Sequence, residues 1–197
     1  MQKKNFLLSM LVVILFGCIG LTGCSSDDYT YSDFHCNLTI DLRAHMKAPL
    51  QAALNSMSPG VFCEISYDAR SRSYIFVNNQ AQRDSSRLNS VDFQLGNEGK
   101  IGMNNGLIVG YGNLSSNDAG GYTFYAFDVQ CPNCFNYNTV PMRSYPLTMN
   151  SAGIATCANC KRQYNMNTGG NCVNNSGKGM TQYRASTTGP LGTLYVN

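Results

Sequence analysis

The chain has 197 residues, with 14 basic and 11 acidic side chains, 9 cysteines and no tryptophan. A formal charge of +3 without any long basic run excludes the electrostatic footprint of a nucleic-acid-binding protein, so no nucleic acid is expected as a partner. The length suits one domain with a hydrophobic core of its own.

The first 23 residues are typical of a secretory signal. A basic start, Lys3-Lys4, is followed by an apolar run and then by small residues. The apolar run is too short to cross a membrane as a helix. We therefore exclude residues 1–23 from the fold. Without them the formal charge falls to about +1, since 12 basic residues remain against 11 acidic ones.

The end of this signal, Leu21-Thr22-Gly23-Cys24, resembles the lipobox of bacterial lipoproteins. The resemblance implies cleavage before Cys24, acylation of its thiol, for example by palmitate, and attachment to a membrane through lipid chains. Residues 24–33 are then a lipidated tether, similar to the surface-export tethers of Bacteroidetes lipoproteins. The expected location is the outer membrane, on its periplasmic face or at the cell surface. An ordinary signal peptide that leaves Cys24 as a free thiol is the alternative.

Residues 34–197 predict one mostly β domain with one short helix. Alternating apolar residues indicate a strand at residues 36–42, and a proline in the first turn predicts a helix at about residues 49–56. Two further alternating segments, residues 61–67 and 73–77, predict a β-hairpin.

The chain after residue 77 is predicted to begin with a polar loop or a solvated surface segment, residues 78–90. Short apolar segments follow, separated by glycine and asparagine. The predicted strands are residues 91–95, 107–111, 122–129, 140–142, 154–156 and 191–196. Short strands at this spacing favour an all-β sandwich or a small barrel.

Four cysteines form two matched turns, Cys131-Pro-Asn-Cys134 and Cys157-Ala-Asn-Cys160. Each turn places two thiols on one side of a tight loop, and two facing turns make a tetrahedral sulfur site of the kind that zinc and iron favour. The sequence therefore predicts a four-cysteine metal site in residues 131–170, on a loop pair like that of a zinc ribbon or a rubredoxin.

Three other cysteines of the domain stand outside these turns. Cys36 and Cys63 are candidates for a disulfide bridge, and Cys172 has no assigned partner, because connectivity cannot be derived from sequence. A compartment outside the inner membrane permits disulfides, so bridges among the four turn cysteines are the alternative to a metal.

From about residue 107 onward, the chain resembles the Rieske iron–sulfur domain. The segment Tyr125-Ala126-Phe127-Asp128 before Cys131-Pro132 is similar to the stretch that leads into that family's first cluster loop. The spacings of the family's second loop are matched by Cys157, Cys160, Tyr164, Thr168 and Gly169. The resemblance covers about the last 90 residues and implies a small β domain that holds a metal centre between two loops.

The departures from the family concern the ligands. Rieske domains use Cys-x-His and Cys-x-x-His, so that two imidazoles hold one of two irons. Here Asn133 and Cys160 occupy the histidine positions, and the histidines of the chain, His35 and His45, lie far upstream. An orthodox Rieske centre is therefore not expected. Three states of the four thiols remain: one Zn²⁺ or mononuclear iron ion, an all-cysteine [2Fe–2S] cluster, or disulfides.

Two functional hypotheses follow. The first is a non-enzymatic cell-envelope protein that binds one metal centre, with a structural role for zinc or single-electron transfer for iron. The second is a surface interaction or ligand-binding β domain whose cysteine pairs are disulfides or a structural staple. Neither a serine elbow nor paired carboxylates point to an enzyme, and the sequence identifies no protein or redox partner.

Overall fold

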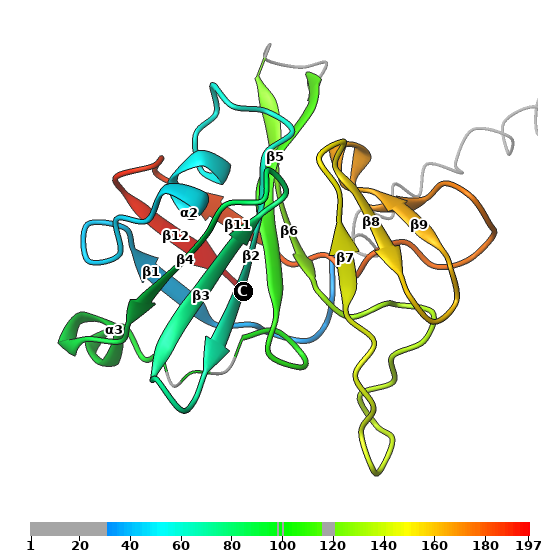
Figure 1. Ribbon diagram of the computed structural model, residues 1–197, viewed down its shortest axis with the longest axis horizontal. Helices are drawn as coiled ribbons and strands as arrows, with labels where there is room; N and C mark the ends of the chain where they lie inside the picture. The colour runs from blue at the N-terminus through cyan, green and yellow to red at the C-terminus, as the bar shows by residue number, and fades with distance from the viewer. Residues whose placement is uncertain (1–30, 98, 100, 116–120) are drawn as a thin grey trace, which may run out of the picture. The chain divides into compact units, whose positions relative to one another are not determined.

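A computed structural model describes residues 31–97, 99, 101–115 and 121–197 (Figure 1). The expected signal peptide and the expected acylation site, Cys24, lie outside these described residues, as does most of the expected tether. The described part forms three antiparallel sheets and two short α-helices. The mostly β fold predicted from the sequence is confirmed. None of the helices in the described ranges is both long enough and apolar enough to cross a membrane.

The largest sheet has five strands in the order β4-β3-β2-β5-β6. In chain order its strands are β2 (Phe62–Asp68), β3 (Ser73–Asn78), β4 (Arg83–Arg87), β5 (Leu107–Ser115) and β6 (Tyr122–Asp128). A three-stranded sheet in the order β1-β12-β11 joins the two ends of the described chain. Its strands are β1 (Leu38–Asp41), β11 (Ala185–Thr187) and β12 (Thr193–Val196).

The third sheet has four strands in the order β10-β9-β8-β7. It is made of β7 (Leu147–Met149), β8 (Ile154–Cys157), β9 (Gln163–Asn165) and β10 (Asn171–Cys172). The helices are α2 (Ala48–Ala53), α3 (Ser90–Gln94) and the 3-10 turn η2 (Met166–Thr168). We call the five- and three-stranded sheets with α2 and α3 the body, and residues 129–181, which contain the four-stranded sheet, the cysteine region.

The five-stranded sheet buries apolar side chains on both faces of its strands β5 and β6. In β5, Leu107 and Val109 pack in the core of the body, whereas Ile108 between them packs in a second core with the cysteine region. In β6, Ala126 and Phe127 divide between the two cores in the same way. A strand buried on both faces has an unbroken apolar sequence, which is why both segments are recognisable in the sequence.

Asn167 of η2 fixes the cysteine region against β5. Its Oδ1 accepts a hydrogen bond from the backbone N–H of Asn113 (3.1 Å), and its Nδ2 donates to the carbonyl oxygen of Ala152 (3.0 Å). Gly112 allows this approach, because a Cβ atom at that position would lie 2.6 Å from the carbonyl oxygen of Asn167. The four-stranded sheet therefore has a defined position beside the larger sheet.

Several predicted elements are wrong. Residues 91–95 form no strand: residues 91–94 belong to α3 and Leu95 is its C-cap, because Asn89 and Asp92 form a capping box that begins a helix. Residues 78–90 contain the polar strand β4, which pairs with β3. Residues 140–142 form no strand, and Val140 is 97% exposed. The described sheets remain open, so of the two predicted architectures the closed small barrel is not formed.

Other elements agree with the sequence. The helix predicted at about residues 49–56 is α2, with Pro49 in its first turn and with Leu50 and Ala53 buried in the body core. It ends three residues earlier than expected, at Ala53. The predicted hairpin is β2 and β3, which pair in register from Cys63 and Asn78 to Asp68 and Ser73.

Candidate metal centre

The first cysteine turn follows β6. The backbone N–H groups of Cys134 and Phe135 both donate to the carbonyl oxygen of Cys131, at 3.1 and 2.8 Å. Pro132 lies between the two cysteines, where its fixed φ suits a tight turn. The turn therefore closes locally, and it directs the Cys131 and Cys134 side chains to the same side.

The second cysteine turn joins β8 to β9. Cys157 is the last residue of β8, its N–H donates to the carbonyl oxygen of Arg162 (3.0 Å), and its own carbonyl accepts from the N–H of Lys161 (3.0 Å). Lys161 has a left-handed backbone, with φ of 60°, which turns the chain back into the next strand. Cys157 and Cys160 are thus held by a tight hairpin.

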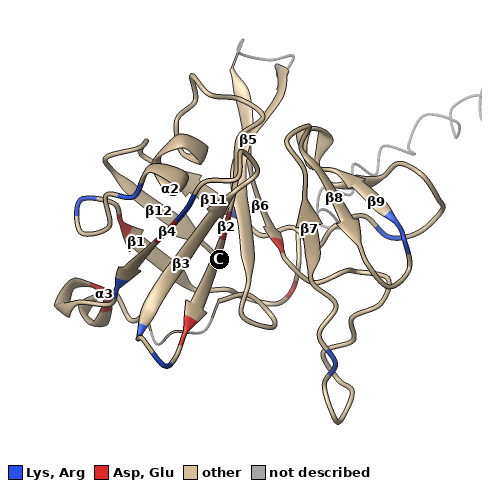
Figure 2. Cartoon of the chain, viewed as in Figure 1, with Lys and Arg blue, Asp and Glu red and all other residues tan. Residues whose placement is uncertain are grey.

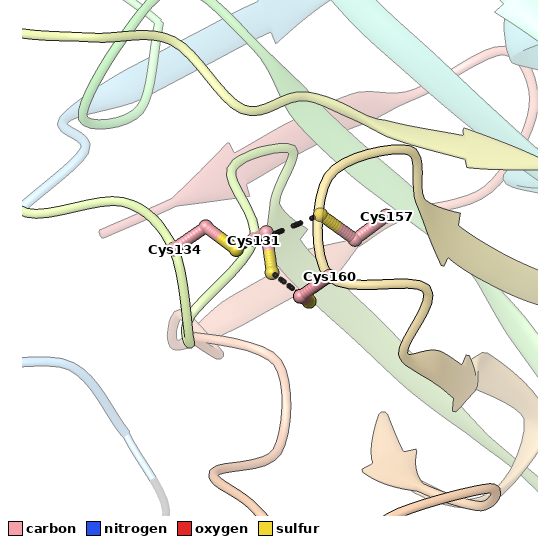
Figure 3. Close-up of side chains that lie close together, drawn as sticks. All are labelled: Cys131, Cys134, Cys157 and Cys160. Carbon is pink, nitrogen blue, oxygen red and sulfur yellow. Dashed lines mark hydrogen bonds between the residues drawn. The ribbon is translucent and has the colours of Figure 1, made fainter.

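The two turns face each other, and their four sulfurs converge (Figure 3). All four Sγ atoms lie within 4.8 Å of one another, with 3.7 Å between Cys131 and Cys160 and 3.9 Å between Cys134 and Cys157. A tetrahedral site with metal–sulfur bonds of about 2.3 Å places its sulfurs about 3.8 Å apart. The separations of 3.7 and 3.9 Å match such a site and far exceed the ~2.05 Å of a disulfide bond, and all four cysteines are free.

Hydrogen-bond donors surround the sulfurs. The Nδ2 of Asn159 donates to the Cys134 Sγ at 3.2 Å. In the other turn, the Nδ2 of Asn133 donates to the Tyr164 hydroxyl (2.9 Å), which leaves that hydroxyl free to donate to the Cys131 Sγ at 3.3 Å. The two asparagines hold equivalent positions in the two turns. Donors to a ligand sulfur stabilise its thiolate and orient it for a metal.

The thiols differ in their acidity. Burial raises the pKa of Cys131 to about 12, and burial also raises the pKa of Cys134. Burial raises the pKa of Cys160 too, but hydrogen bonds from the backbone N–H and guanidinium of Arg162 outweigh it and lower that pKa to about 6. A metal binds thiolates, so an incoming ion finds Cys160 already ionised at neutral pH and has to displace the protons of Cys131 and Cys134.

The charged side chains within the cysteine region are all basic (Figure 2). All 11 acidic residues of the chain precede residue 129, whereas the cysteine region carries Arg143, Lys161, Arg162 and Lys178. Four thiolates around a divalent ion have a net charge of −2, which nearby cations stabilise. The charge distribution therefore suits a metal–thiolate centre.

The other predicted site residues lie apart from this cluster. Cys36 and Cys63, the candidates for a disulfide bridge, are both free thiols in the body core. Burial raises the pKa of Cys36 to about 11 and raises that of Cys63 further, which makes both thiols unreactive. Cys172 is also free, and it pairs with Tyr164 in the β9–β10 register.

Neither histidine of the chain joins the cysteine cluster. His35 lies near the C-terminus, where its Nδ1 is 2.9 Å from the Asn197 Oδ1. His45 is buried, with Nδ1 2.8 Å from the Ser86 hydroxyl and Nε2 2.8 Å from Asp92. Both ring nitrogens are engaged and Asp92 caps α3, so the trio of His45, Ser86 and Asp92 is a structural network. Its members lie far apart in the chain, and no local sequence pattern connects them.

No family model matches the chain, and the comparisons with curated proteins and with solved structures give no match either. A possible metal-binding centre of four cysteines in a mostly β protein is therefore defined by its own geometry.

Proposed function

We propose that the protein binds a single metal ion through Cys131, Cys134, Cys157 and Cys160, and that this ion holds the two turns of the cysteine region together. The observation that carries the proposal is the convergence of four unbridged sulfurs at tetrahedral separations. Four protein ligands leave no position for water or substrate, so a zinc ion here has a structural rather than a catalytic role.

The compactness of the sulfur cluster favours one ion over a [2Fe–2S] cluster. In a two-iron cluster, each iron takes two cysteines, and the second iron with its bridging sulfides pushes the two cysteine pairs apart. Here every pair of sulfurs, within a turn or between turns, lies within 4.8 Å. That distance suits four ligands around one centre.

Mononuclear iron is the second candidate, and the unequal burial of the ligands favours it as a redox site. Cys131 and Cys157 are buried at 0% and 1% exposure, whereas Cys134 and Cys160 are partly exposed. Iron held in this way would exchange one electron through the exposed pair of sulfurs. Its all-thiolate shell would give a lower potential than a shell with two imidazoles.

Elemental analysis of protein purified without oxygen tests both candidates. One zinc per chain and no visible absorption support the structural ion, and one iron with strong visible bands supports electron transfer. Thiol counting in the same sample is the decisive control. A sample that contains neither metal in a stoichiometric amount, and in which all four cysteines are oxidised, would contradict both forms of the proposal.

We also propose that the mature chain is a lipoprotein of the outer membrane, anchored through acylated Cys24. Support comes from Leu21-Thr22-Gly23 before this cysteine and from the polar residues after it. Metabolic labelling with radioactive palmitate tests the anchor. Label should enter the intact chain and be lost in Cys24→Ala, and equal labelling of both would contradict it.

A relationship of the cysteine region to the Rieske domain is part of the same proposal. It is supported by the matching spacings from Cys157 to Gly169 and by the position of the Tyr164 hydroxyl 3.3 Å from the Cys131 Sγ. In such a scaffold, the two histidine ligands of the family would have been replaced, so that all four ligands are cysteine thiolates. A mononuclear centre is the expected consequence, and the elemental analysis above tests it.

A further inference from the structure

Two adjoining cavities lie between the body and the first cysteine turn. One has a volume of about 470 Å³ and the other about 540 Å³, and they share Met103 and Tyr137 as a common wall. Both volumes fall in the range of roughly 300–1,000 Å³ that is usual for ligand sites. We call the two cavities together the Tyr137 cleft.

The described lining of the Tyr137 cleft is polar but almost uncharged. It contains no aspartate or glutamate, and its only lysine is Lys178, with His35 in the other cavity. Carboxamides dominate the polar groups, and among the described residues the side chains of Asn37 and Asn104 have no hydrogen-bond partner. These amides can both donate to and accept from a ligand.

Tyr137 offers a fixed aromatic surface to this cleft. Its side chain is 51% exposed, and its ring meets Phe34 edge-on with 5.3 Å between centroids. Phe34 lies 6.4 Å from the buried ring of Tyr183, which ties the pair to the body core. An aromatic ring that is held in place but half open to solvent can pack against the apolar face of a ligand at little entropic cost.

We infer that the Tyr137 cleft binds a neutral oligosaccharide. A sugar ring carries hydroxyl groups that pair with carboxamides and an apolar face that packs on an aromatic ring. The described lining has no carboxylate that could bind a cationic ligand. Its single lysine would contribute little binding energy to a polyanion. The inference goes beyond the proposed metal function, although the first cysteine turn, with the proposed ligand Cys134, forms part of the cleft wall.

The test is calorimetric titration of the full chain with neutral oligosaccharides of three to six units, namely glucans, mannans and N-acetylglucosamine oligomers. Acidic and basic peptides of similar size serve as comparison ligands. Tyr137→Ala should weaken binding about tenfold, because it removes the stacking surface. Asn104→Ala should also weaken it. Tyr195→Ala is the matched control, since Tyr195 is 49% exposed on β12 outside the cleft, and its loss should change nothing.

Failure of every neutral saccharide at millimolar concentration would overturn the inference, as would binding of the peptides alone. Saccharide binding that Tyr137→Ala leaves unchanged would overturn it as well. Metal content measured in the same samples separates the two proposals. A metal-loaded protein that binds no saccharide contradicts only the cleft, whereas saccharide binding by protein that never takes up metal supports the cleft and contradicts the metal centre.

Discussion

The body and the cysteine region achieve order in different ways. The long strands β2, β3, β5 and β6 of the body have 7, 6, 9 and 7 residues, and its core contains 18 buried apolar side chains. The strands of the cysteine region have 3, 4, 3 and 2 residues, and two of the buried members of its core are the ligands Cys131 and Cys157. Small elements with little apolar surface need a metal or covalent link to stay folded. The body is therefore stabilised by packing, and the cysteine region by its proposed ion as well.

The largest expected effect is the removal of a ligand. Cys157→Ser should release the ion and unfold β7 to β10, because metal binding and local folding are coupled through about 10–16 kcal/mol of binding free energy in structural zinc sites. Elemental analysis should show the loss of metal. Hydrogen exchange should show unprotected amides in β8 and β9, with β2 and β3 still protected.

Cys172→Ser is the matched control for that experiment, because Cys172 is a partly buried thiol of the same sheet outside the sulfur cluster. It should change neither the metal content nor the exchange pattern. Equal effects of the two substitutions would mean that the ligands are assigned wrongly.

The reverse perturbation removes packing from the body. Phe76 is fully buried on β3, and Phe76→Ala should lower the free energy of unfolding by about 3–5 kcal/mol. Phe93→Ala, at a side chain that is 54% exposed, should cost much less. Denaturant titration gives both values. Loss of the metal from folded Phe76→Ala protein would contradict the view that packing stabilises the body and the ion stabilises the cysteine region.

The metal affinity should depend steeply on pH. The pKa values of Cys131 and Cys134 are raised by burial, so both thiols are protonated at pH 7 and lose their protons to the metal. The logarithm of the binding constant should therefore rise with pH by at least about 2 per pH unit near neutrality. Below about pH 6, Cys160 is protonated as well, and the slope should steepen. Competition with a chelator across pH 5.5–8 measures this slope. A metal affinity that does not depend on pH would contradict the assignment of the thiols as ligands.

The smallest expected effect concerns a hydroxyl next to a ligand. Tyr164→Phe removes the group between Asn133 and the Cys131 Sγ but keeps the buried ring, so metal affinity should fall about tenfold with the fold intact. Tyr183→Phe is the control in the body, where the hydroxyl donates to Asp128 at 2.7 Å. It should lower stability and leave metal affinity unchanged. Metal competition assays on both variants separate the two outcomes.

The sequence determined much of this molecule where the relevant physics is local. A Cys-x-x-Cys turn fixes its two thiols over four residues, so the residue spacing alone was enough to name the four candidate ligands. Strands with unbroken or alternating apolar residues, such as β2, β5 and β6, were predictable because burial on one or two faces leaves a direct pattern. The helix α2 was predictable from the proline in its first turn.

Tertiary structure decided the rest, because the forces involved act between residues far apart in the chain. The polar strand β4 exists through its pairing with β3. The capping box of Asn89 and Asp92 that begins α3 is by contrast a local signal, which the reading of residues 91–95 as a strand overlooked. His45 finds Ser86 and Asp92 across 41 and 47 residues. The convergence of the two cysteine turns likewise depends on pairing between separate segments. The Cys131 N–H donates to the carbonyl oxygen of Tyr145, and β7, which follows, pairs with β8, which ends at Cys157.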